Sequence, residues 1–324
     1  METKSVSRMS KLVKSQNFAI MALFVIVFVI FSVGSNFAFL TPVNIKNILN
    51  SMVVTALFTV GAACIMISGQ IDFSSGAVGT MSGVLIATLV TNLGWPLYYA
   101  LPLTMVVAAA VGFLNATLVH QLNFQAFIAT LATSKLCEGL AYVIGQGKSL
   151  PYKEPVLSYL GTGKVFGFVP VAIFLAILVF IVYGILLAKT PFGRSVYLIG
   201  GNPNASRLAG FKPIKISYIL FINNAVLSGI AGCLVVGRLK SATASGTTGQ
   251  LFDGIIAAIL GGVSFGGGSG GMVGAFLGLL IINTFTNGMQ LFGLSASWML
   301  LASGSLLLFA VIFDTMVSTR ARKR

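Results

Sequence analysis

The sequence predicts an all-α membrane protein built as one bundle of about ten transmembrane helices. Hydrophobic residues make up 56% of the chain and charged residues 8%, and the mean hydropathy is +0.98. Many apolar runs reach the ~20 residues that a helix needs to cross the hydrocarbon core of a bilayer. A spanning chain must satisfy its own backbone hydrogen bonds, and runs of this length suit helices rather than barrel strands.

The apolar runs predict ten spans separated by polar or glycine-containing turns. The eighth is the shortest and is bordered by glycines. The predicted spans cover residues 18–33, 48–69, 73–92, 97–119, 124–145, 169–188, 216–236, 253–265, 271–290 and 294–313.

The chain begins with a basic segment, residues 1–17, ahead of the apolar run Phe18–Val33. A secretory signal peptide begins in the same way. The run is long for such a signal, no clean A-x-A cleavage site follows it, and many more spans come after it, so we expect a retained first span. The membrane domain then covers residues 18–313, and residues 314–324 form a basic tail.

Basic residues concentrate on one side of the predicted bundle. Ten spans place both termini and the loop 189–215 on the same side, where 13 Lys and Arg residues lie, against 6 on the other side. Cytoplasmic segments carry the excess of Lys and Arg, so we expect both termini and this loop to be cytoplasmic. The net charge of +14 does not indicate nucleic-acid binding, because the basic residues sit at span ends and not along one face.

The loop 189–215 contains the most informative stretch, KTPFGRSVYLIGGNPNASRLAGF. Asn202 or Asn204 can cap a short helix there, Pro203 suits its first turn, and Gly210 can end it. An ordinary cytoplasmic loop would explain the charge alone. A docking helix for a soluble partner explains the order of the residues as well.

That order resembles the cytoplasmic coupling segment of bacterial ABC-importer permeases of the ribose or simple-sugar type, whose usual form is G-R-x-x-Y-A-I-G-G-N-x-x-A-A-R-L-x-G-I. Eleven residues stand in the matching places: Gly193, Arg194, Tyr197, Ile199, Gly200, Gly201, Asn202, Ala205, Arg207, Leu208 and Gly210. The resemblance implies that contact with an ATPase falls on Gly193, Arg194, Gly201, Asn202, Ala205, Arg207 and Gly210.

Three further stretches extend the resemblance over residues 42–314. Residues 249–293 are similar to the family's G-x-E-L-D-A-I-A-A-V-V-L-G-G-x-S-x-x-G-G-x-G run and the helix after it, although the usual acidic residue before Leu-Asp is displaced. Residues 68–76, SGQIDFSSG, match G-x-I-D-L-S-V-G. Residues 115–131 match N-G-x-L-V…P-P-F-I-x-T-L without the two prolines.

The glycine tract Gly261–Gly271 formally contains a G-x-G-x-x-G dinucleotide pattern. No strand precedes it, and predicted membrane helices flank it on both sides. It also lacks the Gly-Lys-Ser/Thr end of a phosphate loop. We therefore interpret it as a tight turn between closely packed helices, and we expect no ATP site, cofactor or catalytic residue in this chain.

The resemblance implies the membrane subunit of a simple-sugar ABC importer with the ten-span architecture of vitamin-uptake permeases. Its partners would be a cytoplasmic ATPase, an extracytoplasmic sugar-binding protein, and a second permease in a homodimer or heterodimer. It would lie in the bacterial inner membrane, surrounded by lipid and without nucleic acid. Monosaccharides and related polyols are the implied solutes.

Polar and aromatic residues inside the spans are candidates for the translocation path. Ten spans divide into two inverted halves of five, of the kind that transporters use. The third helix of each half begins at an aspartate, although each aspartate can equally cap its own helix. Most amides in spans bond a neighbouring helix. The path candidates are Asp72, Asn115, Phe127, Glu138, Asp253, Asn283 and Asn287.

Glu138 also has a local partner, because Lys135 lies three residues earlier on the same helical face. We expect the two charges to neutralise each other, with a substrate contact as the alternative. His120 at a span end reads as an interfacial residue. Cys64, Cys137 and Cys233 lie far apart in apolar spans and indicate neither a disulfide nor a metal site.

Two other classes of protein remain as alternatives to the importer. An ion-driven secondary carrier needs a membrane acid that takes up the coupling ion. Glu138 is the one acid well inside a predicted span, and Lys135 can already pair with it. A scaffold protein without transport activity is the third class.

Overall fold

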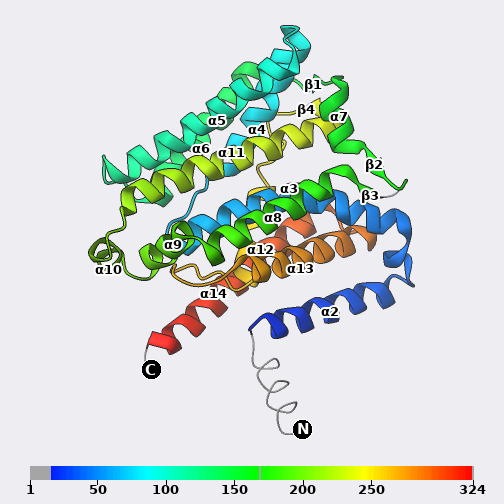
Figure 1. The fold of residues 1–324 in the computed structure, drawn as a ribbon. Coiled ribbons are helices and arrows are strands. Elements are labelled where there is room, and N and C mark those ends of the chain that lie inside the picture. The colour runs from blue at the N-terminus through cyan, green and yellow to red at the C-terminus, as the bar shows by residue number, and fades with distance from the viewer. Residues whose placement is uncertain (1–15, 168, 323–324) are drawn as a thin grey trace.

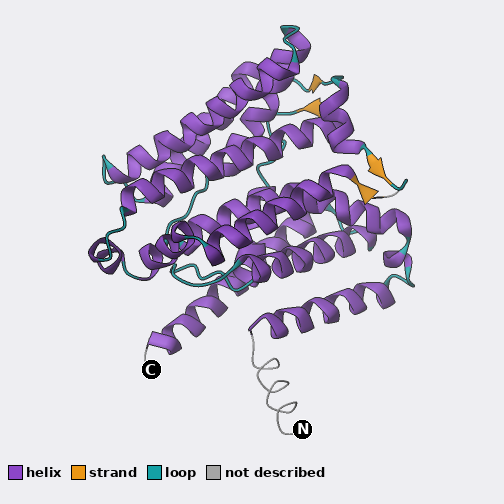
Figure 2. Cartoon of the chain, in the orientation of Figure 1, coloured by secondary structure: helices purple, strands orange, loops and turns teal. Residues whose placement is uncertain are grey.

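The computed structural model describes residues 16–167 and 169–322 of the chain. Helices make up most of this part, and the four strands have two residues each (Figure 2). The predicted all-α class is therefore correct. Of the predicted N-terminal basic segment only Gln16 and Asn17 lie within the described residues, and the last two residues of the basic tail lie outside them.

The first half of the chain forms five long helices joined by short turns. A 3-10 turn precedes the second helix, and a π-helical turn extends the third. The elements are α2 (Gln16–Gly34), η1 (Ala38–Leu40), α3 (Pro42–Ile67), α4 (Ser75–Ala87), η2 (Thr88–Asn92), α5 (Leu97–His120) and α6 (Ala126–Gly145).

The second half adds the remaining helices and all four strands. The elements are β1 (Leu150–Pro151), α7 (Pro155–Thr162), β2 (Lys164–Val165), β3 (Val169–Pro170), α8 (Val171–Lys189), α9 (Pro191–Gly201), α10 (Pro203–Leu208), α11 (Pro213–Leu239), β4 (Ser241–Ala242), α12 (Gln250–Leu260), α13 (Met272–Leu291) and α14 (Ala296–Arg322).

Within the described residues, eight helices are long and apolar enough to cross a membrane: α2, α3, α4 with η2, α5, α6, α8, α11 and α13. The other two predicted spans correspond to shorter apolar segments. Helix α12 has 11 residues and a length of ~16 Å, about half of a bilayer core. The apolar part of α14 is Ala296–Ile312.

The helices form two layers (Figure 1). One layer contains α4, α5, α6 and α11, and the other contains α3, α8, α12 and α13. Each layer has its own cluster of buried apolar side chains, and α11 contributes to both, for example through Phe221 and Cys233. Because α11 also packs on α3, it holds the two layers together.

The two halves exchange their third helices. Helix α4 of the first half packs on α11, and α12 of the second half packs on α3. A non-helical stretch precedes each of these helices, and the one at residues 243–249, which forms turns and bends, crosses from one layer to the other (Figure 1). This reciprocal packing agrees with the predicted division into two related halves.

Non-helical backbone at membrane depth needs protein partners. Residues 243–249 find them on α4, where the Thr247 amide donates to Thr80 Oγ1 at 3.0 Å and Thr247 Oγ1 donates to the Gly76 carbonyl at 2.7 Å. Glycine permits the close approach of α4 to α11, since a Cβ on Gly232 would collide with the Gly79 carbonyl oxygen.

The bundle has two distinct ends (Figure 1). The α10 end holds α9, α10, the first residues of α2 and α13, and the C-terminal part of α14. The α7 end holds α7 and the antiparallel pairs β1–β4 and β2–β3. Tyr152 is fully buried at the α7 end, where desolvation, with Glu154 and Cys233 adding to it, raises the pKa of its hydroxyl.

Candidate functional site

A polar cavity of about 250 Å³ opens between α3, α12, α13 and the last turn of α11, towards the α7 end. Ten of its eleven lining residues are polar or charged, in a chain that is 56% hydrophobic. The lining residues are Asn47, Ser51, Thr55, Arg238, Gln250, Asp253, Ile282, Asn283, Thr286, Asn287 and Gln290.

Helical spacing aligns these side chains. Asn47, Ser51 and Thr55 recur every four residues on α3. On α13, Asn283, Thr286, Asn287 and Gln290 follow the i, i+3, i+4, i+7 pattern of a single helix face. Two polar stripes on otherwise apolar helices therefore face each other across the cavity.

Hydrogen bonds hold the two asparagines of α13 in place. Asn44 Nδ2 donates to Asn287 Oδ1 at 2.8 Å, and Ser51 Oγ donates to Asn283 Oδ1 at 3.2 Å. Asn283 Nδ2 donates to the Leu279 carbonyl within its own helix. Two side chains of α3, Asn44 and Ser51, thus fix the polar stripe of α13 against α3.

Other polar groups at the cavity lack protein partners. Gln250 Oε1 and Thr286 Oγ1 are buried and form no hydrogen bond with the described residues. Within the described part of the chain the one ion pair joins Lys135 to Glu138, so Arg238 and Asp253 are not paired with each other. Arg238 Nη1 donates to the Asn50 carbonyl at 3.0 Å. A buried polar atom without a partner costs ~1–3 kcal/mol, so this lining favours contents that bear hydroxyl groups.

Two other path candidates, Asp72 and Asn115, lie in a separate network away from this cavity. Asp72 Oδ1 accepts from the Ser74 amide at 2.8 Å and from Ser74 Oγ at 2.6 Å, and Asp72 Oδ2 accepts from Asn224 Nδ2 at 2.8 Å. Asn115 Nδ2 donates to Ser74 Oγ, and Thr133 Oγ1 donates to Asn115 Oδ1.

All five residues of this network are buried. The network joins the start of α4 to α5, α6 and α11, so Asp72 and Asn115 have partners that hold the bundle together. Asp253 behaves differently. It lies in the first turn of α12, accepts no capping hydrogen bond from the described residues, and faces the polar cavity.

The last two path candidates, Phe127 and Glu138, lie on α6. Phe127 is half exposed and packs edge-on against Phe73, which in turn contacts Phe252. Glu138 Oε2 accepts from Lys135 Nζ at 2.7 Å, in the i, i+3 contact that the spacing predicts. The structure thus brings together three of the seven path candidates: Asp253, Asn283 and Asn287.

The sequence reasoning did not single out Arg238, Gln250 or Thr286. Arg238 stands at a span end, where it counts as an ordinary flanking charge. The four-residue period of Asn47, Ser51 and Thr55 was the available signal, because three polar residues on one face of a span indicate a polar contact.

At the α10 end, the predicted short helix forms with the predicted signals. Asn202 Oδ1 accepts from the Asn204 and Ala205 amides at 3.0 Å, Pro203 opens the first turn, and Gly210 has a φ of 82°. Ala205 and Arg207 are exposed, and Leu208 keeps 91% of its surface exposed. Helix α10 therefore presents an uncovered surface.

Helix α9 anchors this surface to the bundle. Gly193 touches the Leu187 carbonyl so closely that a Cβ would collide with it, and Gly200 meets the Ile67 carbonyl in the same way. Arg194 and Gly201 are not enclosed, since Arg194 is exposed and a Cβ on Gly201 would meet open space. A displacement of α9 would thus press on the end of α3.

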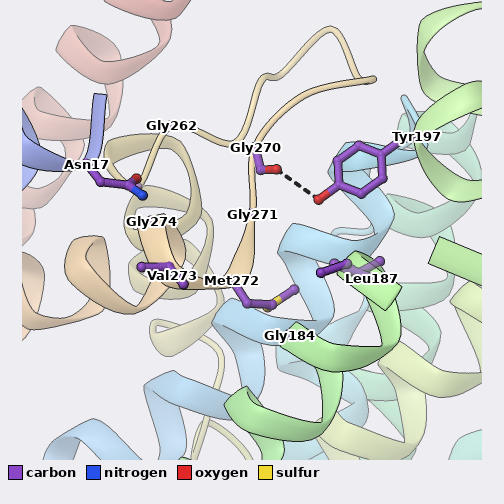
Figure 3. A pocket seen from close by; sticks show the side chains of 12 residues that line it. Asn17, Gly184, Leu187, Tyr197, Gly262, Gly270, Gly271, Met272, Val273 and Gly274 are labelled. Carbon is purple, nitrogen blue, oxygen red and sulfur yellow. Dashed lines mark hydrogen bonds between the residues drawn. The ribbon is translucent and has the colours of Figure 1, made fainter. Parts of the chain in front are cut away.

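The glycine tract joins α12 to α13 as a loop that reaches α9, longer than the predicted tight turn, and Gly261 and Gly278 permit the predicted close packing of the two helices. Gly267, Gly268 and Gly270 have positive φ values. Tyr197 Oη donates to the Gly270 carbonyl at 2.9 Å beside a second cavity of about 490 Å³ (Figure 3). That cavity is lined mostly by glycines and apolar side chains, so it offers few groups that could select a ligand.

Comparison with known proteins agrees with this arrangement. The family described as branched-chain amino acid transport system / permease component matches residues 44–311. The chain belongs to this family. It is the permease component of an ABC transport system, whose ATPase is a separate subunit.

Curated relatives cover most of the permease. The ribose import permease protein of Bacillus subtilis is 34% identical over 281 residues, which are 86% of this chain and 87% of that protein. The ribose import permease protein of Escherichia coli K12 is 31% identical over 91% of this chain and 92% of its own length. The L-arabinose transport system permease protein of the same strain is 33% identical over 85% and 84%. No solved structure matches the permease.

Proposed function

We propose that this permease forms the path by which an ATP-driven importer passes a monosaccharide of the ribose and arabinose class. The polar cavity carries this proposal. Each hydroxyl of a sugar both donates and accepts hydrogen bonds, and the amide and hydroxyl side chains of the cavity can supply both acceptors and donors. The cavity volume of about 250 Å³ lies just below the roughly 300–1,000 Å³ of sites for drug-sized ligands, which suits a small solute.

The proposal includes an orientation and an assembly. Both termini and α10 face the cytoplasm, so the cavity opens towards the outside, where a binding protein delivers the solute. A cytoplasmic ATPase docks on α9 and α10. A second permease, either another copy or a sister chain, completes the path in the inner membrane. The chain passes the membrane ten times, in the manner of vitamin-uptake permeases, with α12 and residues 243–249 together making one pass.

The packing of α9 supports a route for coupling. An ATPase that moves α10 would move α9, because Asn202 both ends α9 and caps α10. Helix α9 touches the end of α3 through Gly200 and the glycine tract through Tyr197. The tract connects to α12 and α13, and α3, α12 and α13 line the cavity. Motion at α10 would thus reach three of the helices that line the proposed path.

Uptake of radiolabelled ribose and arabinose tests the cavity. Asn283→Leu should lower uptake about tenfold, because a lost buried hydrogen bond of ~1.4 kcal/mol corresponds to that factor. Ile282→Leu, a volume-conserving change at the apolar cavity position, should leave uptake near that of the unmodified chain. Equal uptake by both variants at equal membrane levels would remove the cavity from the path.

Vanadate tests the class of transporter. An ATPase-coupled permease should lose uptake when vanadate blocks the partner ATPase. Uptake that resists vanadate and collapses with an ion uncoupler would instead establish an ion-driven carrier.

A further inference from the structure

Two side chains of opposite charge line the polar cavity without pairing. Asp253 lies in the first turn of α12, and Arg238 lies in the last turn of α11. Asp253 forms no ion pair and no hydrogen bond with the described residues, so its carboxyl group is not used to hold the fold together. A charged group in a protein interior is costly unless it has a partner. The contents of the cavity are the available partner for Asp253.

Helix α12 presents a second acceptor one turn before Asp253. Gln250 and Asp253 are three residues apart, so they lie on the same face of the helix, and both line the cavity. Gln250 Oε1 is buried and accepts no hydrogen bond from the described residues. A carboxylate offers two acceptor oxygens and an amide offers one. The α12 acceptor face, defined as Gln250 and Asp253, therefore brings unfilled acceptor oxygens to the cavity.

Arg238 supplies complementary donors to the same cavity. A guanidinium group carries five N–H donors in a rigid plane. Arg238 Nη1 donates to the Asn50 carbonyl at 3.0 Å, which fixes the group against α3, and its other nitrogens have no acceptor among the described residues. The buried hydroxyl of Thr286 on α13 also lacks a partner there. The cavity thus combines unfilled acceptors on α12 with unfilled donors on α11 and α13.

The composition of the lining favours a neutral solute with adjacent hydroxyl groups. Eight of the eleven described lining residues carry neutral amides or hydroxyls, and one cation accompanies one anion. Ile282 is the one apolar residue among them, so the lining has no apolar pocket for the aliphatic side chain of a zwitterionic amino acid. Two hydroxyls on neighbouring carbons can each donate to one oxygen of the same carboxylate, while a hydroxyl oxygen accepts from the guanidinium.

From these contacts we infer that Asp253 determines the specificity of the path by binding two hydroxyls on adjacent carbons of the sugar, with Gln250 and Arg238 beside it. The inference rests on the proposed function, and it adds which part of the solute the permease reads. A sugar that lacks one of the two hydroxyls leaves a buried acceptor unfilled. The permease itself therefore discriminates against deoxysugars.

Uptake of ribose and of its 2-deoxy and 3-deoxy analogues tests this inference. The ratio of ribose uptake to analogue uptake is measured for each variant with the same binding protein and ATPase, so a change in the ratio originates in the permease. Asp253→Leu removes both acceptor oxygens. It should lower the ratio about tenfold for at least one analogue, because ribose loses one more hydrogen bond than that analogue does. Asp253→Asn retains one acceptor oxygen and should give an intermediate ratio.

Glu154→Gln is the matched control, because it also exchanges a carboxyl group for an amide but lies at the start of α7, away from the cavity. Glu154 accepts from the Val156 and Leu157 amides, and a glutamine oxygen can still accept there. Its uptake ratio should equal that of the unmodified permease. An unchanged ratio in Asp253→Leu, whether total uptake persists or falls, overturns the inference and leaves the importer standing. Absence of vanadate-sensitive sugar uptake by the unmodified permease would instead overturn the proposed function.

Thermal unfolding of the purified full-length permease gives a second readout that needs no binding protein. A ligand stabilises the state that binds it, so ribose should raise the melting temperature more than at least one of the two analogues at equal concentration. This difference should shrink in Asp253→Asn, vanish in Asp253→Leu and persist in Glu154→Gln. Free leucine should give no shift. Equal shifts for ribose and both analogues, no shift with any sugar, or a larger shift with leucine would contradict the inference.

Discussion

Asn224 Nδ2 donates a 2.8 Å hydrogen bond to Asp72 Oδ2, which joins two residues 152 positions apart in the chain. Asp72 precedes α4 and Asn224 lies in α11, so the bond ties the third helix of one half to the second helix of the other. Both residues are buried, and Asn224 Oδ1 has no partner among the described residues.

We predict that the loss of stability on replacing Asp72 depends on whether the new side chain can still bond Asn224 and Ser74. Asp72→Leu leaves the Asn224 amide and the Ser74 hydroxyl without their acceptor, at a cost of ~2–4 kcal/mol. Asp72→Asn should be mild, because Asn224 can turn its free oxygen towards the new amide. Thermal unfolding of the detergent-purified protein measures both.

Exchanging the side chains of Asp72 and Asn224 tests directly whether they act as a pair. Asn224→Asp alone places two carboxyl groups together and should destabilise the protein. The double variant D72N/N224D keeps one acid and one amide and should recover most of the melting temperature. Additive losses in the double variant would show that the two side chains do not act as a pair.

We predict opposite effects on stability for alanine substitutions at the two neighbouring glycines at the end of α9, Gly200 and Gly201. Gly200→Ala drives a methyl group into the Ile67 carbonyl and the glycine tract, which should cost ~1–3 kcal/mol and reduce sugar uptake. Gly201→Ala points its methyl group into open space and should leave stability unchanged. Comparable melting temperatures for the two variants would contradict the tight packing of α9.

Single cysteines in a background without the three native cysteines test the proposed orientation. Asn204 on α10 and Val156 on α7 are both exposed and lie at opposite ends of the bundle. An impermeant maleimide applied to intact cells should label Val156→Cys and spare Asn204→Cys, because Lys and Arg concentrate on the α10 side. The reverse labelling pattern would show that the permease has the opposite orientation in the membrane.

Local features of this fold could be predicted from the sequence. The cap of α10 at Asn202 and the contact of Lys135 with Glu138 each depend on residues close in the chain, where spacing sets the geometry. Hydropathy likewise finds the long spans, because each is an apolar helix of 18 or more residues, close to the length that crosses the hydrocarbon core.

Features that depend on contacts between distant segments could not be predicted from the sequence. Residues 243–249 are mostly polar and form turns and bends, so hydropathy carries no sign that they cross between layers. Asp72 and Asp253 stand in similar sequence contexts, yet one is enclosed by Ser74 and Asn224 and the other faces the cavity. Which amides share a cavity depends on how α3, α12 and α13 meet, and no local pattern encodes that meeting.

The proposed coupling runs from a partner ATPase through α10 to sugar movement in this permease. It is tested most directly by measuring vanadate-sensitive ribose or arabinose uptake, and ATPase co-purification, for Arg207→Glu and Ala205→Trp in cells that contain the partner ATPase and binding protein. Both side chains are exposed and lie outside the spanning segments, so both variants should insert normally. Both variants should lose ATPase binding or uptake, because Arg207 would supply a charge-assisted contact and a bulky residue at position 205 would block close approach. Normal insertion, ATPase binding and vanadate-sensitive uptake in both variants would contradict it.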